Sequence, residues 1–374
     1  MAGFLKWVKN SYRYLRRQFN RVRYIHIPIF LEKRRLATYT DGVIEVLTGA
    51  RPETTRKYAL FVLYPSDDTI DNSVLRAFDA LNRADVNILV LANVKLGEKA
   101  LSQIRDKVWR IVHRRNIGFD FGAYKDGVKY LAAERPDAER VLLMNDSVFY
   151  ASPGLDDFIA RLLDGADAIS AFENWGEGYH LQSFAVGVSG EAFRHPAFQS
   201  FWQSYLPVNN RIHAIESGEK KLSDALLRAA KSSCVIYSVA ELTQRMQNDA
   251  SGELVEDYVI PMQWRKLINS NAQGELQPRA DFRIADKYLT LADAVNATST
   301  IHSGAFLFPY FMKCPIYKKD LVYRQRFQFW ELSKLTEKTM PPNEHVEFML
   351  MLRQRGDHKR LPRKLLRQYE IGVK

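Results

Sequence analysis

Three short apolar runs separated by helical patterns most constrain what this 374-residue chain can fold into. They are Tyr58–Tyr64, Val86–Leu91 and Val141–Met144, and near-continuous apolar runs of this length are typical of strands buried on both faces. Helical patterns lie between them, one through Val74–Leu81 and another at Asp126–Ala133. Strands that alternate with helices form parallel sheets with right-handed crossovers. The sequence therefore predicts an α/β fold with a mostly parallel central sheet.

Polar clusters follow three of the predicted strands. Asp67 and Asp68 follow the first strand, Arg114–Asp120 follows a short strand at Val108–His113, and Asn145–Ser147 follows the last. The carboxyl ends of parallel strands lie at one edge of a sheet, and ligands bind beyond that edge. This convergence predicts a nucleotide site.

The Asn145-Asp146-Ser147 cluster resembles a degenerate form of the acidic pair that holds a divalent cation on a diphosphate. Mg²⁺ and Mn²⁺ take oxygen ligands and keep several waters, so one carboxylate and the substrate phosphates can suffice. We therefore expect Asp146 to be a metal ligand. The alternative is an aspartate that caps the next helix, with Asn145 and Ser147 in a turn.

The segment Asn116–Gly122 reads as a glycine-bearing turn ahead of a helix. Glycines permit a tight turn or close approach to a ligand, and a helix N-terminus favours anions. Arg114 and Arg115 precede the turn and are candidates to neutralise a diphosphate. The alternative is a structural loop with surface arginines.

A third group of chemical side chains lies at Glu173–Ser183. An exposed tryptophan beside a carboxylate commonly stacks on a sugar ring, which makes Trp175 a candidate for acceptor binding. His180 alone is more typical of a structural histidine. Glu219 lies near the start of a predicted helix. The helix dipole stabilises an acidic residue there, so this position does not by itself indicate a catalytic role.

The net charge of +11 is concentrated at the two ends of the chain. Residues 1–40 carry a net charge of +9 and residues 353–374 carry +6, so the remainder is −4. Nucleic-acid binding proteins more often spread basic residues over a groove in the folded body, so this distribution argues against that class. Cys234 and Cys314 form no metal-ligand spacing and indicate a reducing compartment.

The N-terminal segment predicts a basic amphipathic helix. Its apolar residues recur at spacings of three and four, and no apolar run is long enough to span a bilayer. This pattern fits a helix in the headgroup layer of an anionic membrane, and the alternative is a helix packed on the body or on a partner subunit. The apolar stripe comprises Phe4, Val8, Tyr12, Leu15, Phe19 and Val22. The expected organisation is this segment at 1–40, a catalytic domain at 55–325 and a helical basic tail at 326–374.

The polar motifs together resemble the rhamnan synthesis protein F family of bacterial polysaccharide glycosyltransferases. The family pattern N-x-G-x-D-F-G-x-W-K-x-G is matched from Asn116, except that Tyr124 replaces tryptophan. The pattern L-x-N-D-S-V-x-G-P is matched at Leu143–Val148, but Ala151-Ser152-Pro153 stands where Gly-Pro is common. The later motifs H-L-Q-S at His180–Ser183 and E-x-x-L-S at Glu219–Ser223 also match. A closing histidine and a P-F-x-K-x-x-L motif correspond to His302 and CPIYKKDLV at Cys314–Val322.

This resemblance implies a GT-A-like, Rossmann-type nucleotide-sugar fold that acts in rhamnose-containing glycan assembly such as O-antigen. The implied donor is a nucleoside-diphosphate sugar of the dTDP-rhamnose type, and the acceptor is a glycan or a lipid-linked glycan. The implied location is the inner face of the bacterial cytoplasmic membrane. The metal ligands are Asp146 and His302, with Mg²⁺ or Mn²⁺ as the cation. The resemblance places Asn116, Gly118 and Asp120 at the donor, Asn145 and Ser147 at its diphosphate, and His180 and Gln182 near the reacting sugars. From the sequence pattern itself we expect Asp67 and Arg115 to bind the donor and Trp175 to bind the acceptor.

We expect direct displacement at the anomeric carbon, with a carboxylate as the base. Glu219 is the first candidate because GT-A enzymes often carry this acid at the start of a late helix, and Glu173 is the second. The alternative is a catalytically inactive, membrane-associated interaction module, favoured by the single carboxylate in Asn145–Ser147. The oligomeric state stays open.

Overall fold

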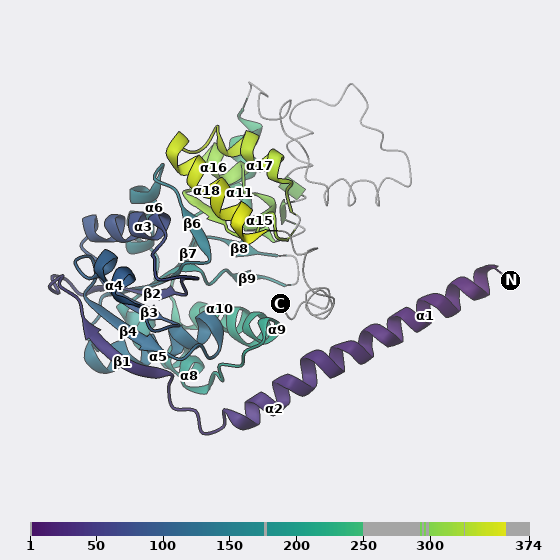
Figure 1. Ribbon diagram of the computed structural model, residues 1–374, viewed down its shortest axis with the longest axis horizontal. Helices are drawn as coiled ribbons and strands as arrows, with labels where there is room; N and C mark the ends of the chain where they lie inside the picture. The colour runs from purple at the N-terminus through teal and green to yellow at the C-terminus, as the bar shows by residue number, and fades with distance from the viewer. Residues whose placement is uncertain are drawn as a thin grey trace.

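In the computed structural model, the chain folds around an eight-stranded mixed sheet with the order β1-β4-β3-β2-β5-β10-β7-β11 (Figure 1). The structure describes residues 2–175, 178–249, 292–293, 295–296, 299–324 and 326–356. The strands of this sheet are β1 (Val43–Thr48), β2 (Lys57–Leu63), β3 (Asn87–Ala92), β4 (Arg110–Arg114), β5 (Arg140–Asn145), β7 (Ala168–Ser170), β10 (Ala185–Ser189) and β11 (Ser233–Val235).

The four central strands, β4-β3-β2-β5, are parallel and confirm the predicted core of the sheet. Successive side chains of a strand point to opposite faces, so a strand covered on both sides is apolar throughout. In β2, Ala59, Phe61 and Leu63 pack with α3 (Asn72–Arg83), α4 (Glu98–Ile104) and α6 (Leu155–Leu163). Its alternate residues pack against α5 (Phe119–Glu134), α8 (Pro196–Ser204) and α10 (Lys220–Ala229).

Antiparallel strands extend the parallel core on both sides. β10 pairs antiparallel with β5 and with β7, and β1 pairs antiparallel with β4 at the other edge. The side chains of β1 alternate between exposed and half-buried, as expected for an edge strand that faces solvent on one side. β1 has no counterpart among the predicted elements, because its alternating pattern lacks the apolar run that identified the core strands.

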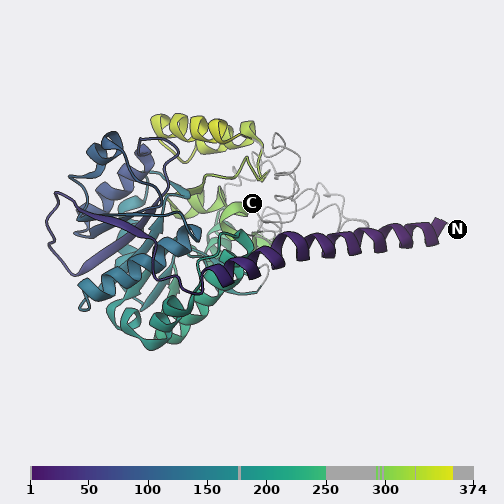
Figure 2. The same cartoon turned by 60° about the horizontal axis from the view of Figure 1, so that its bottom comes forward.

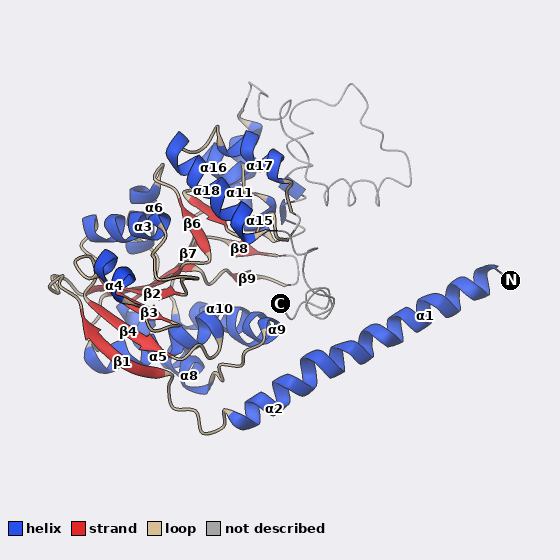
Figure 3. Ribbon diagram, viewed as in Figure 1, coloured by secondary structure: helices blue, strands red, loops and turns tan. Residues whose placement is uncertain are grey.

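A second layer brings the C-terminal part of the chain onto the carboxyl edge of the sheet. The strand β6 (Val148–Tyr150), which directly follows β5, pairs antiparallel with β12 (Ile316–Lys318). A second short pair joins β8 (Glu173–Asn174) to β9 (His180–Leu181). Figure 3 shows the C-terminal helices gathered beside β6. Further helices of the described body are α7 (Gly190–Arg194), α9 (Arg211–His213), η2 (Ala214–Glu219), α11 (Val239–Gln247), α15 (Thr300–Ser303), α16 (Leu307–Met312), α17 (Phe329–Thr336) and α18 (Pro342–Arg355).

Two helix boundaries differ from those expected from the sequence. The helix α5 begins at Phe119, so most of the segment predicted as a turn at Asn116–Gly122 is helical. The late helix begins at Arg211 with α9 and continues through the π-helical η2 into α10. Glu219 therefore lies at the junction of η2 and α10 and not near a helix N-terminus. Single-turn π segments are frequent at functional sites, because they shift the side chains that follow.

The N-terminal helix extends away from the body, as Figures 1 and 2 show. It consists of α1 (Ala2–Arg21), η1 (Val22–His26) and α2 (Ile27–Arg35). At 1.5 Å per residue it is about 50 Å long. Tyr12, Leu15 and Phe19 of the predicted stripe are each more than 60% exposed. No helix in the described part of the chain is long and apolar enough to cross a membrane. The predicted basic tail beyond residue 356 lies outside the described residues.

Candidate functional site

Asp146 is held at the carboxyl edge by the pairing of β5 with β2. The register places Asn145 opposite Val62, and the Asp146 N–H donates to the Val62 carbonyl oxygen at 3.1 Å. Its Oδ2 accepts a hydrogen bond of 2.7 Å from the Tyr64 N–H. Burial raises the pKa of Asp146, and the charge of Lys319 opposes this shift. The hydrogen bond from Tyr64 thus holds the Asp146 carboxylate in place, and the protein around it solvates the ionised form less well than water would.

A tight backbone turn presents Asp120 to the same edge. Gly118 adopts a left-handed conformation with φ +77°, and an added Cβ would lie 2.2 Å from the Cβ of Pro207. Gly122 packs so closely on the Ile117 carbonyl that an added Cβ would lie 1.8 Å from its oxygen. Both positions therefore require glycine for backbone reasons. Gly118 was expected at the donor site. In this structure it orients the first turn of α5, which carries Asp120.

Asn145 connects the two motifs through its side-chain amide. Its Nδ2 donates to Asp120 Oδ2 at 2.9 Å, and its Oδ1 accepts from the Ser147 N–H at 3.1 Å and from the Ser147 Oγ at 2.7 Å. Burial and the neighbouring charge of Asp146 raise the pKa of Asp120 to about 7. The glycine-bearing motif thus supplies a second carboxylate, which is bonded to the neighbour of Asp146 in the chain and interacts with the charge of Asp146. The sequence assigned Asp120 to the donor site but did not show that it completes an acidic pair.

The raised pKa of Asp120 predicts a specific dependence of stability on pH. The folded protein keeps a proton on Asp120 that the unfolded chain loses above its ordinary pKa of 3.8. The free energy of unfolding should therefore fall, through this group, as pH rises from about 4 to about 7 and stay level above that, by up to about 4 kcal/mol. Urea unfolding of the cation-free protein should show this slope, and Asp120→Asn should flatten it. An unchanged slope in Asp120→Asn would contradict the assignment.

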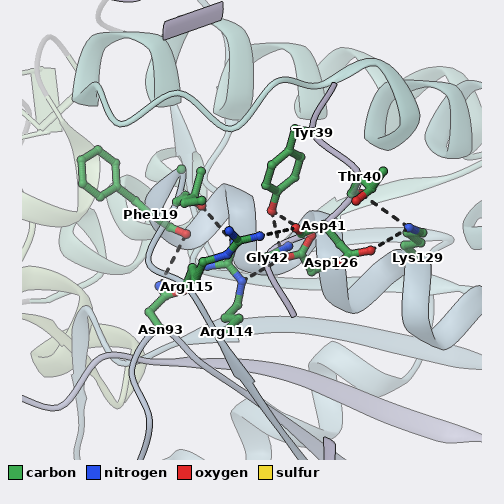
Figure 4. A network of polar contacts seen from close by, with 12 residues as sticks. Tyr39, Thr40, Asp41, Gly42, Asn93, Arg114, Arg115, Phe119, Asp126 and Lys129 are labelled. Atoms are coloured by element: carbon green, nitrogen blue, oxygen red, sulfur yellow. Dashed lines mark hydrogen bonds and ion pairs between the residues drawn. The ribbon is translucent and has the colours of Figure 1, made fainter. Parts of the chain in front are cut away.

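Arg114 is a structural residue in this fold, contrary to the expectation that it faces a diphosphate. Figure 4 shows its guanidinium inside a polar network at the end of β4. It donates to Asp126 at 2.9 Å, to the Ile117 carbonyl at 3.0 Å and to Asn93. The Arg114 and Asp126 side chains are both fully buried. Each of the three guanidinium nitrogens thus has a partner within the protein, as a buried guanidinium needs, and these bonds anchor the loop ahead of Asp120.

Three other predicted donor residues lie in exposed positions around this edge. Arg115 is exposed and donates to the Asp41 carbonyl at 3.4 Å (Figure 4), and Asn116 is exposed in the turn before α5. Asp67 is exposed and accepts hydrogen bonds from Thr69 in the turn after β2. The structure therefore brings together Asp120, Asn145, Asp146 and Ser147. It leaves the other three at the rim.

Glu219 and His180 form a second polar group. His180 Nε2 lies 3.6 Å from Glu219 Oε1, and His180 Nδ1 lies 3.0 Å from the Gly178 carbonyl oxygen. Burial alone would lower the pKa of His180, but the hydrogen bond and charge of Glu219 raise it above its ordinary value. The Leu181 N–H donates to Ser223 Oγ at 2.9 Å, which joins the H-L-Q-S motif to the helix that carries Glu219.

The aromatic part of this region is exposed. Trp175 is 52% exposed, and its ring centroid lies 4.6 Å from that of Tyr179. Burial, together with the charge and hydrogen bond of Glu173, raises the pKa of Tyr179. Gln182 is buried, and its Oε1 has no hydrogen-bond partner among the residues that the structure describes. Trp175 thus offers an open apolar face, and Gln182 offers a buried acceptor oxygen.

His302 is engaged at both ring nitrogens. Its Nδ1 lies 2.7 Å from Ser299 Oγ and its Nε2 lies 2.9 Å from Asp320 Oδ1. Asp320 also pairs with Arg324. His302 therefore presents no free lone pair for a cation in this arrangement, and the expected Asp146–His302 ligand pair gains no support from it. Within the described ranges, no three His, Cys, Asp or Glu side chains group as metal ligands.

Lys318 was not among the site residues expected from the sequence. It is the last residue of β12, and the register places it opposite Val148, directly after Ser147. Its Nζ lies 3.4 Å from Ser147 Oγ. The segment Cys314–Val322 carried a motif resemblance, but its contact with Ser147 joins residues 171 positions apart and depends on the tertiary fold.

Comparison with known proteins places this geometry in a family. A protein of Sinorhizobium fredii (strain NBRC 101917 / NGR234), described as uncharacterized protein y4gN, is 24% identical over 182 residues, 47% of this chain and 47% of that protein. The chain thus spans about half the length of this curated relative.

Solved structures of low similarity are also found. A putative nucleotide-diphospho-sugar transferase from Desulfovibrio desulfuricans G20 is 12% identical, with 59% of this chain and 96% of that one covered and a TM-score of 0.31. A mannosyltransferase from Pyrobaculum calidifontis, solved with GDP-Man and Mn²⁺, is 11% identical, with 91% and 98% covered and a TM-score of 0.28.

The family model for rhamnan synthesis protein F matches residues 88–288, more than half of the chain. The matched region contains both acidic motifs of the carboxyl edge as well as His180 and Glu219. The chain belongs to the rhamnan synthesis protein F family.

Proposed function

We propose that the protein is a GT-A-like glycosyltransferase that moves a sugar from a nucleoside diphosphate to a growing bacterial glycan. The observation that carries this proposal is the cluster of Asp120, Asn145, Asp146 and Ser147 at the carboxyl edge of the parallel strands. Family membership supports it, because the matched region contains this cluster. The site combines a donor side at the acidic pair with an acceptor side at Glu219 and His180.

The acidic pair fits a divalent cation such as Mg²⁺ or Mn²⁺. Two half-buried carboxylates with raised pKa values interact through their charges, and a cation would relieve both their repulsion and their poor solvation. Asp120 and Asp146 would hold the cation, and the diphosphate oxygens and water would complete its ligands. When bound, the cation supplies charge neutralisation for the diphosphate.

On the acceptor side, Glu219 is the proposed base. Its carboxylate takes the proton of the acceptor hydroxyl while the hydroxyl oxygen forms a bond to the anomeric carbon. The bond between that carbon and the diphosphate oxygen breaks, and its electron pair leaves with the nucleoside diphosphate. His180 holds Glu219 in place from 3.6 Å. Glu173 is the second candidate for the base, and Trp175 offers a stacking face to the acceptor.

A donor of the dTDP-rhamnose type and a lipid-linked or glycan acceptor of O-antigen type follow from the family name as part of this proposal. The rival interpretation, an inactive interaction module, rested on the single carboxylate of Asn145–Ser147. In this proposal Asp120 supplies the second carboxylate, which removes the reason for favouring an inactive module.

Calorimetric titration with dTDP, UDP and GDP, each with and without Mn²⁺, tests the proposed function. We expect one nucleotide to bind, more tightly with Mn²⁺, and binding of Mn²⁺ to strengthen as pH rises to about 7 because protons compete for Asp120. Sugar transfer or donor hydrolysis with the matching sugar nucleotides should then follow. Absence of nucleotide binding under all of these conditions would favour the inactive module.

The N-terminal helix is proposed to lie on an anionic membrane surface, at the inner face of the cytoplasmic membrane. It carries an exposed apolar stripe beside many basic residues. Each basic residue near an anionic leaflet contributes about 1 kcal/mol. Liposomes with anionic lipid should float the full-length protein at low salt. A protein lacking residues 1–35, and a Leu15→Glu/Phe19→Glu variant with an otherwise intact chain, should stay in the dense fraction. Equal flotation of all three would remove the membrane proposal.

A further inference from the structure

Lys318 lies between the donor side and the acceptor side of the proposed site. Its Nζ is 3.4 Å from Ser147 Oγ and 4.1 Å from the ring centroid of Phe184, just after the H-L-Q-S motif. The negative charges of Asp320, Glu219 and Asp120 all act on it. Burial nevertheless lowers the pKa of Lys318 from its ordinary value. Three carboxylates from three separate segments thus act electrostatically on one cation.

The neighbouring lysine shows the contrast. Lys319 forms a close ion pair with Asp71, with its Nζ 2.5 Å from Oδ2. Among the described residues, no carboxylate oxygen lies within 4.0 Å of Lys318 Nζ, although the surrounding charge is negative. An ammonium group has three hydrogens to donate, and Lys318 uses one toward Ser147 in this structure. Its other described contact is with the face of the Phe184 ring, so the ammonium group keeps donor capacity for an oxygen atom of a ligand.

We propose that Lys318 binds the leaving diphosphate and stabilises the charge that develops on it during transfer. This inference rests on the proposed function and adds a residue to the donor side. Ser147 belongs to the motif that faces the donor, so a phosphate beside Ser147 lies within reach of the ammonium group. As the bond from the anomeric carbon to the phosphate oxygen breaks, the electron pair stays on that oxygen, and Lys318 neutralises part of the charge without giving up its proton.

This placement has a chemical consequence for the acidic pair. Asp120 and Asp146 need a cation to approach an anionic diphosphate, whereas Lys318 supplies a fixed positive charge from the protein itself. Part of the diphosphate affinity should therefore persist when divalent cations are removed. If Lys318 were purely structural, it would only neutralise the nearby acidic residues. Its replacement would then leave the affinity for diphosphates relative to nucleosides unchanged.

The test compares Lys318→Met with Lys318→Arg and with Lys107→Met as a matched control. Lys107 is also a partly buried lysine, but it pairs with Asp79 at 2.6 Å between α3 and the segment after α4. Binding of dTDP, UDP and GDP, and of the corresponding nucleosides without phosphate, is measured by calorimetry in EDTA. We expect Lys318→Met to weaken diphosphate binding about tenfold or more and to leave nucleoside binding unchanged. Lys318→Arg and Lys107→Met should bind like the wild type.

The turnover rate gives a second readout. Loss of one donor to a developing negative charge typically costs about 10²–10³ in kcat, and we expect this loss in Lys318→Met at saturating donor. Lys318→Gln serves as a second neutral variant if the methionine variant does not fold. If the wild type binds diphosphates and the neutral variants bind them equally well, the inference fails and the proposed function stands. If the wild type binds no nucleoside diphosphate in EDTA but binds one with Mn²⁺, this inference fails and the proposed function stands. If it binds none with or without Mn²⁺, the proposed function fails, and this inference fails with it.

Discussion

Replacing Asp146 by alanine is expected to abolish sugar transfer, by at least about 10³-fold, while the protein remains folded. The main-chain bond from Asp146 to Val62 survives the substitution, and only the side-chain bond to the Tyr64 N–H is lost. Because burial disfavours the ionised carboxylate, its removal should cost little stability. The rate loss follows because the donor diphosphate then lacks one of the two carboxylates that would hold its cation.

A transfer assay with the sugar nucleotide selected by calorimetry measures this loss, and thermal unfolding reports the fold. Asp146→Asn is the matched control, since its amide oxygen still accepts from Tyr64 while the charge is gone. Both variants should be inactive and should unfold within a few degrees of the wild type. Near-normal turnover in either one would refute the role of Asp146.

The second large effect is expected from Glu219→Gln. A positioned base contributes about 10²–10⁴-fold to the rate, so kcat should fall by that factor. Donor binding should be retained, because Glu219 lies on the acceptor side, at 3.6 Å from His180. Glutamine preserves the size of the side chain, which separates loss of the base from loss of packing.

His180 provides an independent readout of the same substitution. Burial lowers the pKa of His180, the hydrogen bond and charge of Glu219 raise it most, and the Gly178 carbonyl adds a smaller increase. In Glu219→Gln the pKa of His180 should therefore fall, which an NMR titration of the imidazole can follow. Glu173→Gln is the comparison variant and should leave the pKa of His180 unchanged. If Glu219→Gln keeps the wild-type rate and Glu173→Gln does not, the base is Glu173.

Much of the sheet was predictable because its core strands are buried on both faces. Continuous apolar runs marked β2, β3 and β5, and their parallel order brings Asp146 to the end of β2, where it accepts a hydrogen bond from the Tyr64 N–H. The edge strand β1 was missed because an alternating pattern of six residues is a weak signal without its partner.

The roles of individual polar residues were less predictable. Arg114 was expected at the diphosphate, since arginines are seldom fully buried, yet Asp126 and Asn93 pair with it inside the fold. The ring nitrogens of His302 face Ser299 and Asp320, a pairing whose partners are separated by up to 18 positions. Sequence spacing alone does not show which polar atoms are already paired.

The sequence by itself determined the α/β class and the positions of the acidic motifs at strand ends, because both depend on local periodicity and on the shared direction of parallel strands. Only the tertiary structure decided that Asp120 becomes the second carboxylate beside Asp146 and that Lys318 reaches Ser147. Electrostatic interactions depend on distances between atoms, and elements far apart in the chain set those distances. The charges of Asp120, Asp146 and Lys318 therefore come together only when β12 pairs with β6 and α5 contacts the end of β5.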